Sequence, residues 1–475
     1  MTTIDLVILA GYFLAVLYIG CLCRRKDTSA GEQYLAGHGM GWIPIGLSVM
    51  VTSFSAINFV ALPEEVFSHG LYVVVSFPVF FLAAWPISRI WMPFFHGMRL
   101  TSVYEYFERR FDRRVRHLCS GLFLCWRFFW MATMLYASGK IFGVFTGWNL
   151  FVMIGLCGFI ATAYTTLGGI RAVMWTDVLQ FGVLFTGIAL AVIYCFTGNV
   201  PSVWHTVLES GRLAPYVPFD RNFLSFDPRI RMTFWSGLLG VFTAFMARYG
   251  ADQVVMQRYF TARDLRMAQR GIWLNAFASS VSLSLLALLG LAVYARASAS
   301  GMPLAGPGAA LKALAAMIAS FPTGLTGLVL AGILAATMSS VDSGINSCAA
   351  ALWTDFPSVA RRYGLTSRRL TFLLGGSVTL LSLVLVPVFG NRGEIFPIVN
   401  KFVNGLGSPL LAMMVLAMFS RRVTSCGMFY GGLTGLLASL AFGFFLKPLA
   451  LQYYAVVNFM VCLAACYVFS VGRKN

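Results

Sequence analysis

Charged residues are scarce in this chain. Asp, Glu, Lys and Arg together make up only 11% of its 475 residues, whereas soluble globular domains typically carry about 25%. Hydrophobic residues reach 59%, and the mean hydropathy is +0.78. This balance excludes a soluble protein and predicts one that crosses the lipid bilayer many times.

The chain also lacks the residue spacings of a metal centre, a disulfide framework or an enzyme. Its five histidines are scattered, and none of its ten cysteines has the spacing of a zinc site. No arrangement of nucleophile, base and acid typical of a catalytic site is found. We therefore expect a protein that is not an enzyme. We also expect no cleavable signal peptide, because the first apolar segment has no basic region before it and is long enough to span.

Thirteen apolar segments have the length and composition of membrane spans. They cover residues 5–23, 41–62, 71–95, 116–143, 149–167, 172–197, 233–256, 271–295, 323–353, 369–388, 394–418, 426–445 and 451–471. With the N-terminus outside, most of the 35 Lys and Arg residues fall in inner loops, Arg258 among them. The net charge of +18 therefore needs no nucleic acid to explain it. We expect a multi-pass protein of the cell inner (plasma) membrane with a cytoplasmic C-terminus. No obligate protein partner is evident.

Residues 331–356, AGILAATMSSVDSGINSCAAALWTDF, combine an apolar helix of membrane length with a central cluster of hydroxyls and a carboxylate. Polar side chains at this depth usually mark an ion or solute pathway. Ala336, Ser339, Ser340 and Ser343 are three or four residues apart and share one helix face. Their carbonyl and hydroxyl oxygens suit a hard cation such as Na⁺. For the serines alone, close packing of small residues between helices explains the pattern equally well.

The second span is interrupted in its middle by polar residues. In GLSVMVTSFSAINFVALP (46–63), Thr52, Ser53, Ser55 and Asn58 fall within seven positions. Transporters use broken helices at the membrane midplane to present backbone carbonyls and polar side chains. The alternative is an intact helix in which each hydroxyl bonds the preceding turn. Four polar residues so close together favour a binding site.

Three other spans carry polar groups. Asp177 lies about two turns beyond Gly168-Gly169, which we expect at an inner turn, and a carboxylate at that depth should face protein. Asp252, near the end of the seventh span, is expected to have a structural role and to pair with a nearby arginine. Polar residues at 400–404 interrupt the eleventh span.

Four stretches together resemble the sodium:solute symporter family: YTTLGGIRAVMWTDVLQ, DQVVMQRYF, AATMSSVDSGINS and GLGSPLLAMMVLAMF. That family includes sodium/multivitamin, iodide, monocarboxylate and bacterial sodium/sialic acid transporters. The resemblance implies a single all-α membrane transporter domain over residues 1–475, with about 13 transmembrane helices and a leucine-transporter-like fold. Two inverted five-helix repeats would occupy 41–197 and 233–418, with a preceding helix at 5–23 and two C-terminal helices at 426–471.

The resemblance also implies where co-transported Na⁺ binds. A first site would use the backbone oxygens of Val51, Phe54 and Ala336 and the hydroxyls of Ser339 and Ser340. Some members have a second site, which here would involve Asp177, Asp342 and Ser343 together with the same two serines. Asp342 stands where the family pattern has a hydroxyl, so the number of coupled ions stays open.

The positions that match solute-facing residues of the family are Ser53, Ser55 and Asn58, with Asn404 as a looser match. Arg127 and Arg248 lie within spans, and such a pair would favour an anionic solute. The alternative is that Arg127 pairs with a buried acid while the Arg248 side chain extends to the inner surface. Both interpretations remain open from the sequence.

We therefore predict a Na⁺-coupled secondary active symporter that imports a small organic solute by alternating access. A carboxylate such as a sialic acid or a monocarboxylate is the expected solute. A neutral sugar or an amino acid such as proline is the alternative. Coupling to H⁺ instead of Na⁺, a transporter-like membrane sensor and a channel are more remote readings. We expect no signalling domain after residue 475, which argues against a sensor, and we expect bulky Phe54 and Phe59 beside the site, which argues against an open channel.

Overall fold

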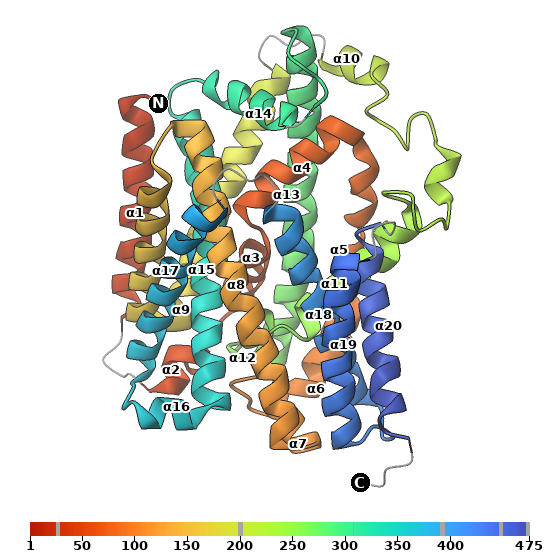
Figure 1. Ribbon diagram of the computed structural model, residues 1–475. Helices are drawn as coiled ribbons and strands as arrows, with labels where there is room; N and C mark the ends of the chain where they lie inside the picture. The colour runs from red at the N-terminus through yellow and green to blue at the C-terminus, as the bar shows by residue number, and fades with distance from the viewer. Residues whose placement is uncertain (25–28, 198–202, 307, 390–394, 446–449, 472–475) are drawn as a thin grey trace.

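The computed structural model describes the backbone of residues 1–24, 29–197, 203–306, 308–389, 395–445 and 450–471. Side chains at 389, 395–405 and 443–445 lie outside this description. Within these ranges every regular element is a helix, and the long helices run along the height of one bundle (Figure 1). The predicted all-α class is confirmed, and all thirteen predicted spans fall on helices.

Eight helices in the described part of the chain are long and apolar enough to cross a membrane, and a bent pair makes a ninth. One of the eight, α9, contains two of the predicted spans. The elements of the bundle are α1 (Thr3–Leu22), α3 (Trp42–Ser53), α4 (Ala56–His69), α5 (Val79–Pro86), α6 (Met92–His96), α8 (Arg113–Thr146), α9 (Leu150–Thr197), α11 (Val241–Gly250), α12 (Gln253–Phe260), α13 (Leu265–Ala299), α15 (Leu325–Asp355), α17 (Ser367–Phe389), α18 (Ile395–Phe419), α19 (Ser425–Phe445) and α20 (Tyr453–Val468).

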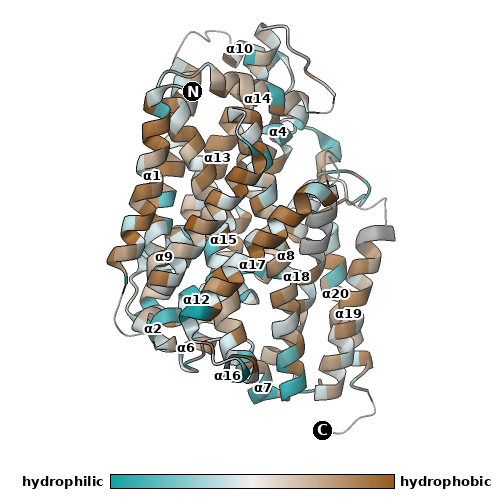
Figure 2. Cartoon of the chain, turned by 60° about the vertical axis from the view of Figure 1, so that its left-hand side comes forward, coloured by the Kyte–Doolittle hydropathy of each residue, from teal (hydrophilic) through white to brown (hydrophobic). Residues whose placement is uncertain are grey.

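Helix α15 forms the centre of the bundle. Its most apolar stretch is 94% buried, against 28% for α1 and 22% for α17, and it packs on α1, α3, α8 and α9. Hydrophobic residues cover the outer helices along their length, while hydrophilic ones gather toward the two ends (Figure 2). A polar side chain on α15 therefore meets protein rather than lipid, and it needs a partner there.

The second span is broken, as predicted. Helices α3 and α4 meet at an angle of 64°. Between them Phe54 (φ −104°, ψ 123°) and Ser55 (φ −115°, ψ 164°) are extended. Ser55 begins α4 as a capping residue, since its N–H and hydroxyl donate to Asn58 Oδ1 at 3.0 and 2.9 Å. The break leaves carbonyl groups at the end of α3 without partners in their own helix.

Helix α9 contains the predicted turn at Gly168-Gly169. Gly169 has φ +58° and ψ −153°, a conformation that L side chains rarely adopt. A Cβ at this position would also lie 2.5 Å from the Gln33 carbonyl oxygen. The turn separates the two spans of α9 and sets the position of Asp177 in the second.

The seventh span differs from its predicted extent of 233–256. The helix ends at Gly250, the backbone is extended at Asp252 (φ −85°, ψ 120°), and the short helix α12 follows. Arg258 lies on α12 with 0% exposure, so its assignment to an inner loop is wrong. The chain turns back into the protein after α11, where Arg258 finds partners on other helices.

Candidate ion and solute sites

The break between α3 and α4 lies against the middle of α15 and brings carbonyl and hydroxyl oxygens together. Ser339 Oγ lies 3.1 Å from the carbonyl oxygens of both Val51 and Ala336. Ser340 Oγ lies 3.2 Å from Ala336 O and 3.4 Å from both Phe54 O and Thr52 O. The structure thus gathers all five oxygens expected for the first cation site, and Thr52 O adds a sixth. We call these six oxygens the neutral cluster.

The spacing of the neutral cluster suits a small hard cation. At an ion–oxygen distance of about 2.4 Å, the range for a cation such as Ca²⁺, two ligand oxygens at a right angle lie about 3.4 Å apart. The closest spacings measured here are 3.1–3.4 Å. No member carries a formal charge, so the cluster attracts a cation only through dipoles.

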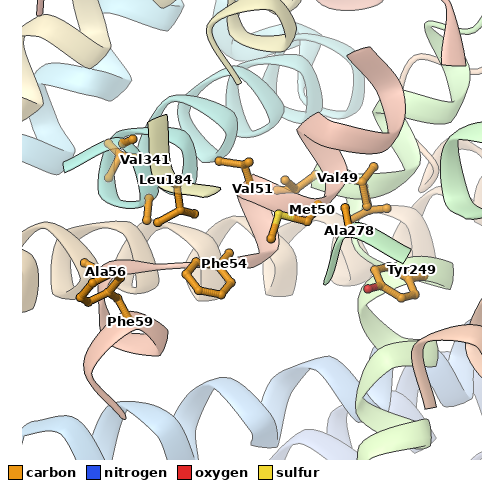
Figure 3. Packing of buried hydrophobic residues seen from close by; sticks show 14 of the residues in the cluster. Val49, Met50, Val51, Phe54, Ala56, Phe59, Leu184, Tyr249, Ala278 and Val341 are labelled. Carbon is orange, nitrogen blue, oxygen red and sulfur yellow. The ribbon is translucent and has the colours of Figure 1, made fainter. Parts of the chain in front are cut away.

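Hydrophobic side chains enclose the break. Figure 3 shows Val51 at the end of α3 and Phe54 on the extended link, among buried hydrophobic residues of the same core that include Leu184 of α9 and Val341 of α15. Val51, Leu184 and Val341 are each at most 1% exposed. A low-dielectric wall of this kind strengthens the attraction of nearby carbonyl dipoles for a cation.

A second polar cluster lies next to the first and is organised around Arg258. Its Nε donates to Ser48 Oγ at 2.6 Å and its Nη2 to Thr52 Oγ1 at 2.8 Å. The same Nη2 also donates to Ser343 Oγ and lies 3.4 Å from Asp177 Oδ2. Ser48 in turn donates to Asp177 Oδ2. Arg258 and Asp177 are both fully buried, so they form an ion pair shielded from water.

We call the group around Arg258 the ion-paired cluster, and Asp342, next to Ser343 in α15, adds a second fully buried carboxylate. Its Oδ2 accepts the hydroxyl proton of Tyr164 on α9. Among the described residues, the Oδ1 atoms of Asp342 and Asp177 have no hydrogen-bond partner. The structure therefore brings the three residues of the expected second cation site to one place, but it adds a guanidinium group that the sequence analysis did not place there.

A cavity of about 270 Å³ lies on the other side of the α3–α4 link. It draws on five helices or their ends and is lined by Asn58, Trp126, Gly240, Val241, Ala244, Phe245, Ala247, Arg248, Gly407, Ser408, Leu451, Gln452 and Ala455. Its volume lies just below that of typical ligand pockets, roughly 300–1,000 Å³. A small solute with a few polar groups fits this lining.

Arg248 provides the only cationic group in the lining of this cavity among the described residues. Its Nη1 donates to the Ser53 carbonyl oxygen at 3.1 Å, and no ion pair of Arg248 is found in the described part of the chain. The Ser53 hydroxyl is buried without a described partner. Arg248 and Asn58 thus line the cavity, Ser53 contacts Arg248 through its carbonyl without being part of the lining, and Ser55 caps α4. The solute-binding roles of these residues stay predictions.

Arg127 is placed differently from Arg248. It is 7% exposed, and its guanidinium forms an ion pair with Asp252, to which Nε also donates at 3.3 Å. Its charge lies 4.7 Å from the ring centre of Trp126, which lines the cavity. The pairing predicted for Asp252 is present, and the Arg127 charge is neutralised behind the cavity wall. Asn404 lies in α18, but its side chain is outside the described part of the structure.

A larger cavity, of about 740 Å³, shares Asn58, Leu451 and Gln452 with the first. Its rim carries an ion pair between Arg231 and Glu65, which lies near the far end of α4. Helix α4 rises toward the end of the bundle where the N-terminus lies (Figure 1). The two cavities therefore form a route from the α3–α4 link toward that end.

The sequence analysis missed Arg258, Gln452 and Ser408 as site residues. Arg258 had a detectable signal, because the apolar run Val254–Met256 precedes it and two aromatic residues follow. Such flanks are unusual for an arginine in a solvated loop. Gln452 lies just before α20 and has no comparable signal, since only the packing of α20 near α11 brings it to the cavity.

Comparison with known proteins identifies the family of the chain. A family model described as "Sodium:solute symporter family" matches residues 33–435. The chain is 30% identical over 444 residues to the sodium-dependent multivitamin transporter of Oryctolagus cuniculus. The aligned region covers 90% of this chain and 67% of that transporter. It is 27% identical to the sodium/sialic acid symporter NanT of Aliivibrio fischeri, over 100% and 94% of the two chains.

Among solved structures, the fold is similar to that of a Na⁺-coupled sialic acid symporter in a substrate-bound, outward-open state. The TM-score is 0.87, with 22% identity over 100% of this chain and 98% of that chain. Another match is Mhp1, a nucleobase-cation-symport-1 family transporter, with a TM-score of 0.57 and 15% identity. These likenesses support the leucine-transporter-like fold.

Proposed function

This chain belongs to the sodium:solute symporter family, and we propose that it imports a small carboxylate-bearing solute together with Na⁺ by alternating access. As a family member it is an integral membrane, sodium-coupled solute transporter. The carboxylate, the residues that hold it and the direction of transport are the new parts of the proposal.

One observation carries the proposal. The segment 51–58, which contains the extended link and the adjoining ends of α3 and α4, contributes both to the neutral cluster and to the wall of the 270 Å³ cavity. The carbonyls of Val51 and Phe54 contact the serines of α15, while the Ser53 carbonyl accepts from Arg248 and Asn58 lines the cavity. A cation that orders this link therefore also orders the solute site, which is the physical requirement for coupling.

In the transport cycle we propose, Na⁺ enters from outside and is held by Val51 O, Phe54 O, Ala336 O and the hydroxyls of Ser339 and Ser340. Its binding fixes the break between α3 and α4, and the solute then binds against a preorganised wall. After the bundle rocks to the inward-open state, low internal Na⁺ empties the neutral cluster. The link loosens, and the solute leaves.

Arg248 is the reason for proposing a carboxylate. Its planar guanidinium can bind a carboxylate through two parallel hydrogen bonds, and it faces the cavity without a described ion pair. Sialic acid, the solute named for NanT of Aliivibrio fischeri, carries a carboxylate, and a monocarboxylate is the simpler candidate. Ser53, Asn58, Ser408 and Gln452 would bind the neutral polar groups of such a solute.

A neutral solute, such as a sugar or proline, is the second candidate. The observation that favours it is the number of neutral polar groups on the cavity wall: Asn58, Ser408 and Gln452 against one arginine. In that case Arg248 would have no contact with the solute, and its hydrogen bond to the Ser53 carbonyl would only stabilise the link between α3 and α4.

We propose that the end of the bundle at which α1 begins faces outward in the cell inner membrane. The support is the inner position of most arginines under the positive-inside rule. The route formed by the two cavities would then open to the outside.

A panel of radiolabelled solutes in proteoliposomes, with and without a Na⁺ gradient, tests this function. The panel contains sialic acid, small monocarboxylates, glucose and proline. We expect Na⁺-driven accumulation of an acid. Accumulation of a neutral solute alone would support the second candidate, and accumulation driven by a pH gradient without Na⁺ would contradict sodium coupling.

A further inference from the structure

We propose that a cavity between α6, α12 and the start of α13 binds a small, water-soluble organic phosphate. Its described lining shares no residue with the two cavities described above, and the transport cycle gives it no task. Helix α6 lies toward the end of the bundle where the C-terminus lies (Figure 1). That end faces the cytoplasm in the proposed orientation, and only this placement of the site rests on the proposed function.

The first observation is the basic character of this cavity. Its volume is about 370 Å³, which lies within the roughly 300–1,000 Å³ of ligand pockets. Four exposed basic side chains belong to its lining, those of His38, His96, Arg99 and Arg263. None of its described lining residues is acidic. A lining of this kind attracts an anion and holds no carboxylate that would repel it.

The two arginines of the lining come from different segments. Arg99 follows α6, and Arg263 precedes α13. No ion pair of Arg99 is found in the described part of the chain. Arg263 pairs with the part-exposed Asp264 at 3.9 Å, and so long a pair in contact with water holds the guanidinium only weakly. Both groups can therefore bind the oxygens of a phosphate, which the planar guanidinium geometry matches.

His38 is fixed in place by the end of α12. Its Nδ1 lies 2.7 Å from the Phe260 carbonyl oxygen, and because a carbonyl only accepts, Nδ1 is the donor. The other ring nitrogen, Nε2, donates to an anion when the imidazole carries both protons. Nearby, Met40 N donates to Thr261 O at 3.0 Å, and Arg263 N donates to Met40 O at 3.1 Å. These bonds hold one wall of the cavity in place before a ligand binds.

The less exposed part of the lining is apolar and aromatic. It includes Met92, Phe95, Met256 and Phe260, and the rings of Phe95 and Phe260 meet edge to face with their centres 6.5 Å apart. Tyr259 also lines the cavity and is 6% exposed, and its hydroxyl is buried without a described hydrogen-bond partner. A buried hydroxyl without a partner is costly, and a ligand oxygen would satisfy it. The lining therefore suits a ligand with a phosphate at one end and an apolar ring at the other.

The position of the cavity on α13 favours a water-soluble ligand over a phospholipid. Ala268 lines the cavity and is buried. Phe277 of the same helix is 59% exposed and marks a face that meets lipid. The two residues are about two and a half turns apart, so they lie on opposite sides of α13. A phospholipid with its phosphate in the cavity would have to pass its chains around the helix.

The test is isothermal titration calorimetry of the full-length transporter in detergent, with phenyl phosphate as the probe. Three further probes separate its parts: inorganic phosphate lacks the ring, benzoate replaces the phosphate by a carboxylate, and phosphatidylglycerol carries its phosphate on a lipid. The buffer contains no Na⁺, so that the coupled solute site contributes little. We expect phenyl phosphate to bind at least about tenfold more tightly than each of the three. Equal binding of any of them, or no binding of phenyl phosphate, overturns the inference.

A double variant assigns the binding to this cavity. Arg99→Gln with Arg263→Gln removes two charges from the lining and should weaken binding of phenyl phosphate about 30-fold, which is about fivefold for each arginine. The matched control is Arg266→Gln with Arg270→Gln, which removes two exposed charges from the start of α13 outside the lining. In the control, binding should change by less than about threefold. Unchanged binding in the first double variant, or equal losses in both, overturns the inference.

Size-exclusion chromatography in detergent checks the folding of both double variants. If the first does not fold, Arg263→Gln alone is the second test, with an expected loss of about fivefold, and unchanged binding in that variant also overturns the inference. The titration does not measure transport. Its failure therefore leaves the proposed Na⁺-coupled import intact, and failure of that import in proteoliposomes leaves the phosphate site intact.

Discussion

The neutral cluster and the ion-paired cluster share Thr52, yet they deal with positive charge in opposite ways. The Thr52 backbone oxygen lies 3.4 Å from Ser340 Oγ, while its hydroxyl accepts from Arg258. One cluster offers dipoles without formal charge, and the other holds an aspartate–arginine pair. Dipoles can bind a cation weakly enough to release it in every cycle, whereas a fully buried ion pair is costly to separate. A site for a transported ion and a site that holds the fold together can therefore be neighbours.

Of the variants that test this difference between the two clusters, Asp177→Asn is expected to have the largest effect. The substitution leaves the buried Arg258 charge without its anionic partner, which typically lowers the free energy of unfolding by about 3–5 kcal/mol. We expect a large loss of thermal stability and, in the protein that still folds, an unchanged Na⁺-to-solute ratio. Thermal unfolding in detergent and dual-label flux measure the two quantities.

Two further variants control this prediction. Asp264→Asn changes a part-exposed capping aspartate and should cost well under about 1 kcal/mol, because Asn caps a helix about as well as Asp. Asp177→Asn combined with Arg258→Met removes both charges and should be more stable than Asp177→Asn alone. A well-folded Asp177→Asn protein with a lower flux ratio would instead make Asp177 a ligand of transported Na⁺.

The next effect in size concerns the neutral cluster. Replacing both Ser339 and Ser340 with Ala removes two ligand hydroxyls, at about 1–1.5 kcal/mol each. The Na⁺ concentration for half-maximal uptake should therefore rise about 30- to 150-fold, with expression intact. Thr337→Val is the matched control, since this hydroxyl on the same helix donates only to Ile333 O. Unchanged Na⁺ dependence in the double variant would remove the neutral cluster as the ion site.

A smaller effect distinguishes the two arginines near the solute cavity. Arg248→Lys loses the planar pair of donors and should weaken binding of the carboxylate solute about tenfold, which is about 1.4 kcal/mol. Binding of the corresponding amide should change less. Competition of unlabelled acid and amide against the labelled solute measures both. Equal losses for acid and amide, or none, would favour the neutral solute.

The smallest effect is expected where an ion pair is open to water. Arg231 and Glu65 meet at the rim of the larger cavity, with side chains 57% and 18% exposed. Glu65→Gln should change the free energy of unfolding by less than about 1 kcal/mol, because exposed ion pairs contribute little. Thermal unfolding measures this change as well. If Glu65→Gln destabilised the protein as much as Asp177→Asn, burial would not explain a difference in stability between the two ion pairs.

The sequence alone was sufficient for the fold class and the spans, and its resemblance to the symporter family named five of the six oxygens that the structure brings together in the neutral cluster. Hydropathy locates membrane helices because lipid leaves no other way to satisfy the backbone. The spacing of Ala336, Ser339 and Ser340 places them on one helix face, and the polar residues at 52–58 predict the break opposite. Gly168-Gly169 predicts the turn, since Gly169 adopts a positive φ. These inferences depend on local chemistry that each segment carries by itself.

Only the tertiary structure decided what the buried charges do. Arg258 lies 81 residues from Asp177 and 210 from Ser48 in the sequence, and Arg127 lies 125 residues from Asp252. The apolar flanks of Arg258 indicate burial, but the sequence does not show which acid its side chain meets. That depends on which helices pack against it. Because that partner sets the free energy of burying the charge, packing alone separates the ion-paired Arg127 and Arg258 from Arg248 at the cavity wall.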